Sequence, residues 1–104
     1  IGVKFGGGKN TFNYSFSKHC MEFIPNDFKS WSKDNVLINN LRIGVTNTKI
    51  HKKIKKGLSM KKRINLIPAK RMASPSEIAD YIVYLISEKN SYITGQTLSI
   101  SGGE

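Results

Sequence analysis

Residues 74–101 read SPSEIADYIVYLISEKNSYITGQTLSIS, and this stretch decides the fold class. Ser74 can cap a helix, Pro75 suits the first helical turn, and Glu77 completes a reciprocal capping pattern three residues later. Apolar residues then recur at helical spacing as far as residue 87, namely Ile78, Ala79, Ile82, Leu85 and Ile86. After a polar turn, residues 97–101 have the pattern of a strand that ends at two glycines. The stretch therefore predicts one amphipathic helix followed by one β-strand.

Two segments upstream extend this pattern to a second strand. Residues 36–43 read VLINNLRI, which predicts a strand. Its residues expected to be buried are Val36, Ile38 and Leu41. Residues 58–66 predict a short helix that ends before Pro68. A strand, a helix and a second strand in this order form a parallel crossover unit, whose helices lie against a sheet, so we expect an α/β fold.

Residues 12–33 predict one long helix with an apolar face. The residues of that face recur at intervals of three and four and are Phe16, Cys20, Phe23, Ile24, Phe28 and Trp31. Because proline removes a backbone hydrogen bond and costs roughly 3 kcal/mol in a helix interior, Pro25 predicts a kink at residues 21–25. Cys20 is expected to be a core residue rather than a reactive thiol. As the only cysteine it excludes an internal disulfide and has no cysteine partner for zinc, so we expect no metal site.

The chain has too few strands for a complete domain. Its 104 residues have room for one domain at most, and no apolar run reaches the roughly 18 residues of a membrane span. Parallel strands are normally covered on both faces within a larger sheet, so two strands alone leave edges and helix faces exposed. The first residue, Ile1, is not a methionine. We expect an incomplete domain, with further residues upstream, of a cytoplasmic protein.

The net charge of +10 is concentrated in one segment. Residues 49–63, KIHKKIKKGLSMKKR, hold 8 of the 17 basic residues and no acidic ones, whereas the rest of the chain has 9 basic and 7 acidic residues. Such a run can bind phosphates of nucleic acid, or it can form a solvated loop. The chain also contains 9 Asn and 13 Ile, which indicates a general compositional bias, and the segment lacks the interleaved aromatics of single-strand binders. We favour the solvated loop over nucleic acid as a partner.

Tyr14 and Lys18 form the pair with the clearest chemical use. They lie four residues apart on a predicted helix, so their side chains project from the same side. A free tyrosine has a pKa of about 10, and an adjacent ammonium lowers that pKa because it favours the phenolate. A phenol tuned in this way can exchange a proton with a carbonyl or alcohol oxygen while hydride moves at carbon. By itself the spacing is also that of an ordinary surface pair.

Four landmarks in a fixed order place this pair in a wider context. They are residues 13–18 (NYSFSK), 40–48 (NLRIGVTNT), 67–79 (IPAKRMASPSEIA) and 92–103 (YITGQTLSISGG). Together they resemble the C-terminal half of the short-chain dehydrogenase/reductase family, from the Y-x-x-x-K helix to the last strand. The resemblance implies a Rossmann-type, doubly wound parallel sheet in three α/β/α layers. Residues 1–104 would be the C-terminal portion of one such domain, incomplete as given, with a basic substrate-loop region at about residues 49–66.

The resemblance also implies roles for individual residues. Tyr14 would be the catalytic acid/base, and Lys18 would lower its pKa and hydrogen-bond the nicotinamide ribose of NAD or NADP. Gly44 stands at the glycine of the family's Pro-Gly turn, which lets the backbone approach the nicotinamide, although Ile43 replaces the proline. The cofactor carboxamide would be held by the turn residues Val45, Thr46 and Thr48. For the two threonines, ordinary turn chemistry is the alternative.

Other parts of the family's site fall outside this pattern. The glycines at 6–8 follow no strand, so they do not match the turn that binds pyrophosphate, and the catalytic serine would fall at or just before Ile1. The resemblance implies a homo-oligomer, a dimer or tetramer, with an interface built by the helix after Ser74 and the strand at 97–101. The substrate would be a small carbonyl or alcohol compound. His51 and the lysines of the basic segment could select an anionic one.

Three functions are compatible with these observations. The first is an NAD(P)-dependent oxidoreductase that transfers hydride between nicotinamide and a carbonyl/alcohol substrate, an enzyme in its full-length form and inactive as 104 residues alone. The second is a basic module that binds nucleic acid or another anionic partner, and the third is a non-catalytic remnant of the enzyme. We expect the first function, because the joint occurrence of four landmarks is more specific than a run of lysines.

Overall fold

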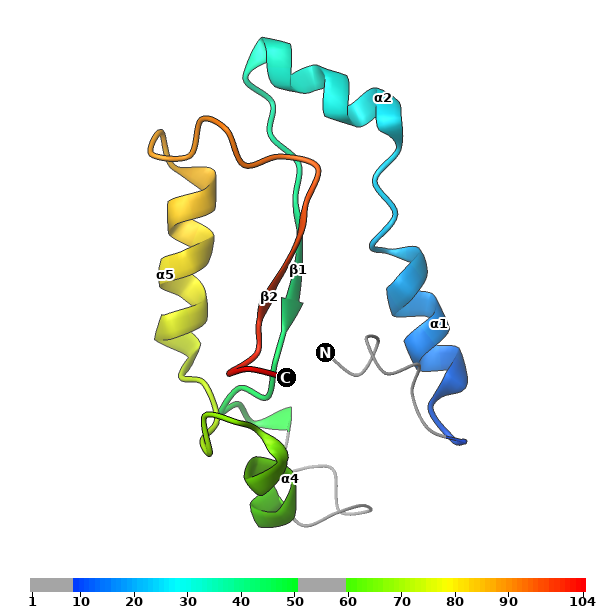
Figure 1. The fold of residues 1–104 in the computed structure, drawn as a ribbon, viewed down its shortest axis with the longest axis vertical. Coiled ribbons are helices and arrows are strands. Elements are labelled where there is room, and N and C mark those ends of the chain that lie inside the picture. The colour runs from blue at the N-terminus through cyan, green and yellow to red at the C-terminus, as the bar shows by residue number, and fades with distance from the viewer. Residues whose placement is uncertain (1–8, 51–59) are drawn as a thin grey trace.

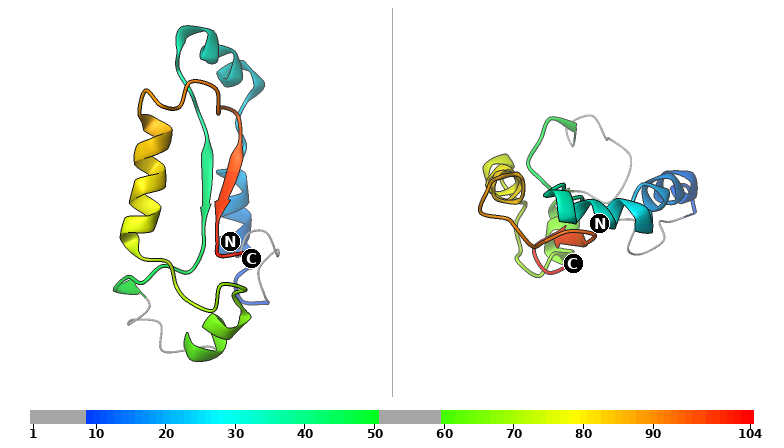
Figure 2. Two further views of the ribbon diagram at one scale, coloured as in Figure 1. Left: turned by 60° about the vertical axis from the view of Figure 1, so that its left-hand side comes forward. Right: turned by 90° about the horizontal axis from the view of Figure 1, so that it is seen from above.

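The computed structural model describes residues 9–50 and 60–104. Its elements in chain order are α1 (Phe12–Cys20), α2 (Asn26–Lys29), the 3₁₀ helix η2 (Ser30–Asp34), β1 (Asn40–Ile43), α4 (Met60–Leu66), α5 (Pro75–Ile86) and β2 (Thr97–Ile100). β1 and β2 pair in parallel, with Asn40 opposite Thr97 and Ile43 opposite Ile100. Figures 1 and 2 show α5 on one side of the strand pair and α1 on the other. The predicted α/β class and the parallel crossover are confirmed.

The N-terminus of α5 has the capping arrangement that its sequence predicts. The Ser74 hydroxyl accepts a hydrogen bond from the Glu77 N–H at 3.2 Å, and the Glu77 carboxylate accepts one from the Ser74 N–H at 2.8 Å. Pro75 occupies the first helical position. Two hydrogen bonds from the Arg71 guanidinium, together with the Ser74 N–H, lower the pKa of the Glu77 carboxyl to about 2. Local sequence therefore determines where this helix begins.

The single kinked helix predicted for residues 12–33 is wrong, although the interruption lies where Pro25 predicts it. The chain leaves the helical conformation after Cys20, and Pro25 is extended, with φ −54° and ψ 144°, as the residue before α2. Proline has no N–H, and it disfavours helical geometry in the residue before it. The result is three short elements, α1, α2 and η2, in place of one helix.

The predicted strand at residues 36–43 is shorter than expected, because ladder pairing begins at Asn40. Upstream of Asn40, the Ile38 N–H donates to the Thr94 hydroxyl at 3.0 Å and the Gly95 N–H donates to the Ile38 carbonyl at 2.7 Å. Gly95 has a φ of +68°, so the partner segment turns there and cannot continue a regular ladder. Val36, expected to be buried, is exposed.

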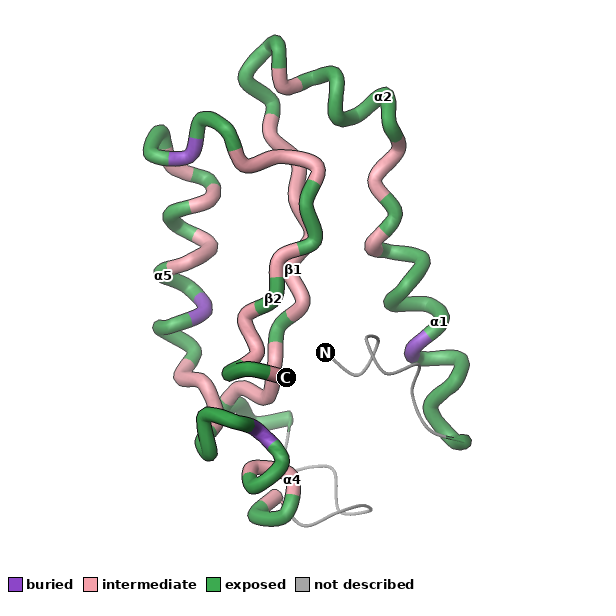
Figure 3. The backbone as a smooth tube through the Cα atoms, viewed as in Figure 1, coloured by how far each residue is buried: buried purple, intermediate pink, exposed green. Residues whose placement is uncertain are grey.

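Burial in the described part of the chain is sparse, as Figure 3 shows. Its buried residues are Ser15, Ile67, Ile78 and Asn90. The expected core positions that are exposed instead are Phe16, Cys20, Phe23, Phe28, Trp31, Val36, Ala79 and Ile86. The periodicity correctly marked apolar faces, but a face becomes a core only where another element covers it. No described element covers these faces to the extent of burying them.

α4 agrees with the short helix predicted at residues 58–66, over the residues that the structure describes. Arg63 of α4 forms an ion pair with the Glu104 carboxylate, and the following Ile67 is buried. No helix within residues 9–50 and 60–104 is both long and apolar enough to span a bilayer. The glycines at 6–8, and the basic residues from His51 to Lys56, lie outside the described residues.

Candidate active site

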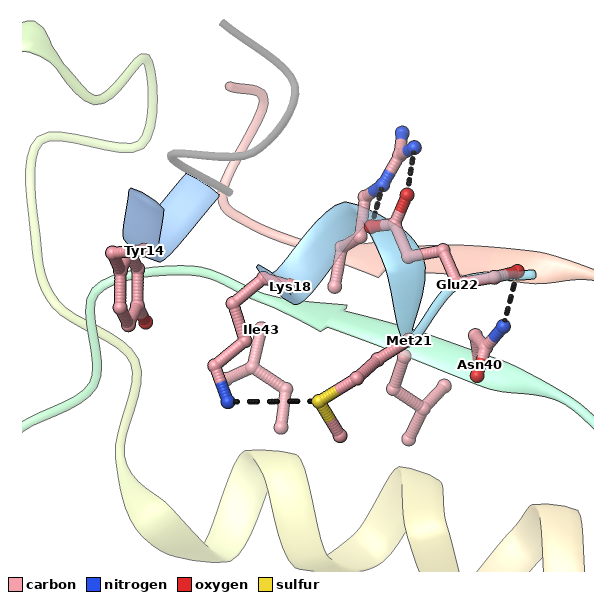
Figure 4. A pocket seen from close by; sticks show the side chains of 8 residues that line it. Tyr14, Lys18, Met21, Glu22, Asn40 and Ile43 are labelled. Carbon is pink, nitrogen blue, oxygen red and sulfur yellow. Dashed lines mark hydrogen bonds and ion pairs between the residues drawn. The ribbon is translucent and has the colours of Figure 1, made fainter. Parts of the chain in front are cut away.

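α1 brings Tyr14 and Lys18 together as their spacing predicts. The Lys18 ammonium nitrogen lies 5.8 Å from the centre of the Tyr14 ring, which is within the range of a cation–π contact. The same nitrogen lies 4.0 Å from the Met21 sulfur. Figure 4 shows Tyr14 and Lys18 on the same side of α1, with Lys18 between Tyr14 and Met21. The phenol and the ammonium therefore project into a common space from one helical face.

That space is a pocket of about 320 Å³ between α1 and β1. Its lining residues are Tyr14, Lys18, Met21, Glu22, Asn40, Leu41, Arg42 and Ile43. Tyr14 is 62% exposed, so its hydroxyl is accessible to a small molecule that enters the pocket. In open α/β sheets, ligands bind beyond the carboxyl ends of parallel strands, and the pocket reaches that end of β1 at Ile43.

Glu22, just after α1, connects this helix to β1. Its carboxylate accepts two hydrogen bonds of 2.6 Å from the Arg42 guanidinium, one at each oxygen. Its backbone carbonyl accepts a 2.7 Å hydrogen bond from the Asn40 side chain. The hydrogen bonds from Arg42 hold the pKa of the Glu22 carboxyl below its usual range, and the same bonds raise the pKa of Arg42.

Sequence reasoning missed Glu22 and Arg42 as site residues. Lys18 and Glu22 are four residues apart, a spacing that favours a local ion pair along a helix. α1 ends at Cys20, however, and Glu22 pairs with Arg42, which is 20 residues away in the chain. The available signal was the alternation of Asn40 and Arg42, which places both side chains on one face of β1.

The turn after β1 contains Gly44, whose small size has a structural reason within the fold itself. The Gly44 N–H donates to the Ile100 carbonyl at 2.8 Å. A Cβ at Gly44 would lie 2.7 Å from the Ser101 Cα and 3.2 Å from the Ile100 oxygen. The missing side chain therefore allows close contact with the end of β2, and the predicted approach of the Gly44 backbone to a nicotinamide stays a prediction.

The remaining predicted cofactor residues follow in the same turn, and they lie outside the set that lines the pocket. The Val45 carbonyl accepts a hydrogen bond from the Ala73 N–H at 3.0 Å, and Thr46 forms an isolated parallel bridge with Ala73. The Thr46 hydroxyl donates to the Gly44 carbonyl at 3.1 Å, which is the ordinary turn chemistry considered as its alternative. Thr48 is exposed. The structure thus brings Tyr14 and Lys18 together in one pocket, and the turn that contains Val45, Thr46 and Thr48 follows the carboxyl end of β1.

Metal chemistry has no support in this region. Residues 9–50 and 60–104 contain no group of three or more His, Cys, Asp or Glu side chains arranged to hold a metal ion. Cys20 is exposed, which corrects the expectation that it packs in the core. The chemistry available to the described site is therefore that of a phenol, an ammonium and a guanidinium–carboxylate pair.

A parallel α/β unit with helices beside its strands defines a class, that of α/β proteins with a Rossmann-type sheet. Comparison with known proteins identifies the family within that class. A family model described as enoyl-(acyl carrier protein) reductase matches residues 4–104. The chain belongs to the short-chain dehydrogenase/reductase family.

Individual relatives agree with this assignment. The chain is 34% identical over 102 residues to the 3-oxoacyl-[acyl-carrier-protein] reductase FabG of Buchnera aphidicola subsp. Schizaphis graminum, covering 97% of this chain and 41% of that protein. It is 36% identical over 92 residues to an acetoacetyl-CoA reductase of Acinetobacter, covering 88% of this chain and 37% of that one. The chain thus spans less than half the length of these relatives.

Solved structures show the same partial match. The crystal structure of YwfH, an NADPH-dependent reductase involved in bacilysin biosynthesis, is 28% identical, with a TM-score of 0.78 over 97% of this chain and 42% of that chain. A short-chain dehydrogenase family protein from Francisella tularensis subsp. tularensis SCHU S4 is also 28% identical, with a TM-score of 0.76 over 98% of this chain and 47% of that one. The described elements therefore have the arrangement of the corresponding part of a Rossmann-type fold.

Proposed function

We propose that residues 1–104 are the C-terminal part of a longer NAD(P)-dependent oxidoreductase, referred to below as the full-length reductase. Two observations support an incomplete domain: a sheet of two strands in the described residues, and relatives of which the chain covers 41% or less. Two parallel strands rarely form a stable sheet, because their edges and faces need cover. The preceding part of the domain would supply that cover.

The reaction is hydride transfer between a nicotinamide cofactor and a carbonyl or alcohol compound. The observation that carries this proposal is the Tyr14–Lys18 pair in a pocket at the carboxyl end of β1. The relatives support it, since they include a 3-oxoacyl-[acyl-carrier-protein] reductase, an acetoacetyl-CoA reductase and an NADPH-dependent reductase. When bound, the nicotinamide supplies or accepts the hydride.

The residues of this chain donate and accept the proton. As a carbonyl is reduced, the Tyr14 hydroxyl donates its proton to the carbonyl oxygen, which becomes the alcohol oxygen. In the reverse direction, the Tyr14 phenolate accepts that proton. The Lys18 ammonium stabilises the phenolate by its charge, and its remaining hydrogens can bond to a ribose hydroxyl. The donors that the pocket offers therefore fit a nicotinamide nucleoside beside Tyr14, with Val45, Thr46 and Thr48 in the adjoining turn as further contacts.

The test is Tyr14→Phe in the full-length reductase, with Tyr92→Phe as the control. Loss of the hydroxyl is expected to lower kcat by about 10²- to 10⁴-fold, because one proton transfer loses its acid, while cofactor affinity measured by NAD(P)H fluorescence stays within about threefold. Tyr92 is 94% exposed, and its variant is expected to keep normal turnover. Near-normal turnover of Tyr14→Phe would refute the assignment. In a second arm, residues 1–104 alone are expected not to oxidise NAD(P)H, and measurable oxidation by a folded monomer would refute the incomplete domain.

A further inference from the structure

The Glu22–Arg42 pair occupies an unusual place relative to the Tyr–Lys helix. Among the described residues, three hydrogen bonds join the α1 segment to β1, and Glu22 is a partner in each. In Figure 4, Met21 lies between Lys18 and Glu22, and Glu22 lies next to Asn40. α1 itself does not pack closely along β1, so these contacts are its main described connection to the strand. These hydrogen bonds therefore help to fix the end of α1 relative to β1.

The pair is also suited to hold a fixed geometry. The two guanidinium nitrogens meet the two carboxylate oxygens in the planar, bidentate form that gives directional as well as electrostatic stabilisation. The side chains of Glu22 and Arg42 are only 15% and 25% exposed, so water competes weakly for them. Glu22 lies two residues beyond Cys20, the last residue of α1, so its hydrogen bonds to β1 hold the end of that helix near the strand.

We infer that Glu22 and Arg42 are positioning residues, which orient the Tyr14–Lys18 pair relative to the strand end where the substrate reacts. This inference rests on the proposed function. The two residues take no proton and touch no reacting atom. Their contribution is to hold the end of α1, and with it the phenol and the ammonium, in place relative to β1 and to Ile43, which lines the same pocket.

A positioning role predicts a specific kinetic effect. Displacement of catalytic groups by about 1 Å can reduce turnover up to a hundredfold, so Glu22→Gln in the full-length reductase is expected to lower kcat roughly tenfold to a hundredfold with little change in KM. The charged groups that line the pocket are Lys18, Glu22 and Arg42, and His19 Nδ1 lies 3.4 Å from Glu22.

A matched control exists at the start of α5. Arg71 and Glu77 form a bidentate pair with hydrogen bonds of 2.7 and 2.8 Å, remote from Tyr14 in the fold. Glu77→Gln also removes an ion pair, and it is expected to change neither kcat nor KM. A loss of catalysis shared by Glu22→Gln and Glu77→Gln would mean general destabilisation, and it would overturn the positioning role.

The double variant Glu22→Gln/Arg42→Gln keeps the test valid if one single variant folds poorly. A single change leaves one partly buried charge without its partner, whereas the double variant leaves neither charge. If the two residues act as one unit, Glu22→Gln, Arg42→Gln and the double variant lose similar amounts of kcat. Strictly additive losses, or a double variant with the parent's kcat, would overturn the inference.

The two proposals fail in different ways. If Tyr14→Phe retains turnover, the proposed function is wrong and the positioning role falls with it. If Tyr14→Phe abolishes turnover while Glu22→Gln has the kcat and KM of Glu77→Gln, only the positioning role is wrong.

Discussion

Replacement of Gly44 by alanine tests how the turn at the end of β1 is built. The added Cβ would lie 2.7 Å from the Ser101 Cα, and 3.2 Å from both the Ile100 oxygen and the Ser101 Cβ. The nearest of these atoms belong to backbone, which cannot rotate away as a flexible side chain can. The ends of β1 and β2 must therefore separate, and the 2.8 Å hydrogen bond from the Gly44 N–H to the Ile100 carbonyl must lengthen.

The magnitude follows from three contributions. Forcing extra atoms into a filled space costs about 1–3 kcal/mol, and a weakened backbone hydrogen bond costs about 1 kcal/mol. Alanine also restricts the unfolded chain more than glycine does, which favours folding by about 0.4–1 kcal/mol. Gly44→Ala is therefore expected to reduce the free energy of unfolding by about 2 kcal/mol, with the hydrogen bond and the close contact as the larger effects.

The assay is urea unfolding of the full-length reductase, with Ser99→Ala as the control. Ser99 is an exposed residue of β2, so its variant is expected to unfold within about 0.5 kcal/mol of the parent. Hydrogen exchange at residue 44 is expected to accelerate in Gly44→Ala, because its N–H loses a good acceptor. A Gly44→Ala protein as stable as the parent, with unchanged exchange at residue 44, would refute this account of the turn.

Two further predictions concern pH and a buried amide. The Arg42 hydrogen bonds lower the pKa of Glu22, so the pair stabilises the fold above the ordinary Glu pKa of 4.5 and loses that stabilisation as the pH falls through the lowered pKa. At pH 7, the unfolding free energy of Glu22→Gln is expected to lie about 2 kcal/mol below that of the parent. Urea titrations at progressively lower pH should show this difference shrinking, and a constant difference would contradict the prediction. The buried Asn90 side chain donates to two backbone carbonyls and accepts a hydrogen bond from the Ile93 N–H at 2.9 Å. Asn90→Ala is therefore expected to lower the free energy of unfolding, measured in urea, by about 2–4 kcal/mol. Replacement of the exposed Ser91 by alanine is expected to lower it by under about 0.5 kcal/mol. Equal stability of the Asn90 and Ser91 variants would show that the Asn90 contacts contribute nothing.

The elements that sequence predicted best are those with local determinants. The cap of α5 needs only Ser74 and Glu77, three residues apart, and the structure has both of its reciprocal hydrogen bonds. Tyr14 and Lys18 need only one helical turn between them, and the structure brings them together. The predicted length of the first helix was too great. Whether Pro25 kinks a helix or interrupts it depends on how the flanking segments pack, and the spacing of apolar residues carries no information on that packing.

The sequence by itself determined the α/β class, the order of the elements, the Tyr14–Lys18 pair and its family resemblance, because each of these rests on residues close together in the chain or on an ordered set of motifs. Only the tertiary structure decided that Glu22 pairs with Arg42, that Gly44 accommodates Ser101, and which apolar faces stay exposed. These features join residues that are 20 or more positions apart, and a residue's own neighbours in the chain do not specify such partners. The packing of β1 against β2 and against the segment after α1 specifies these partners.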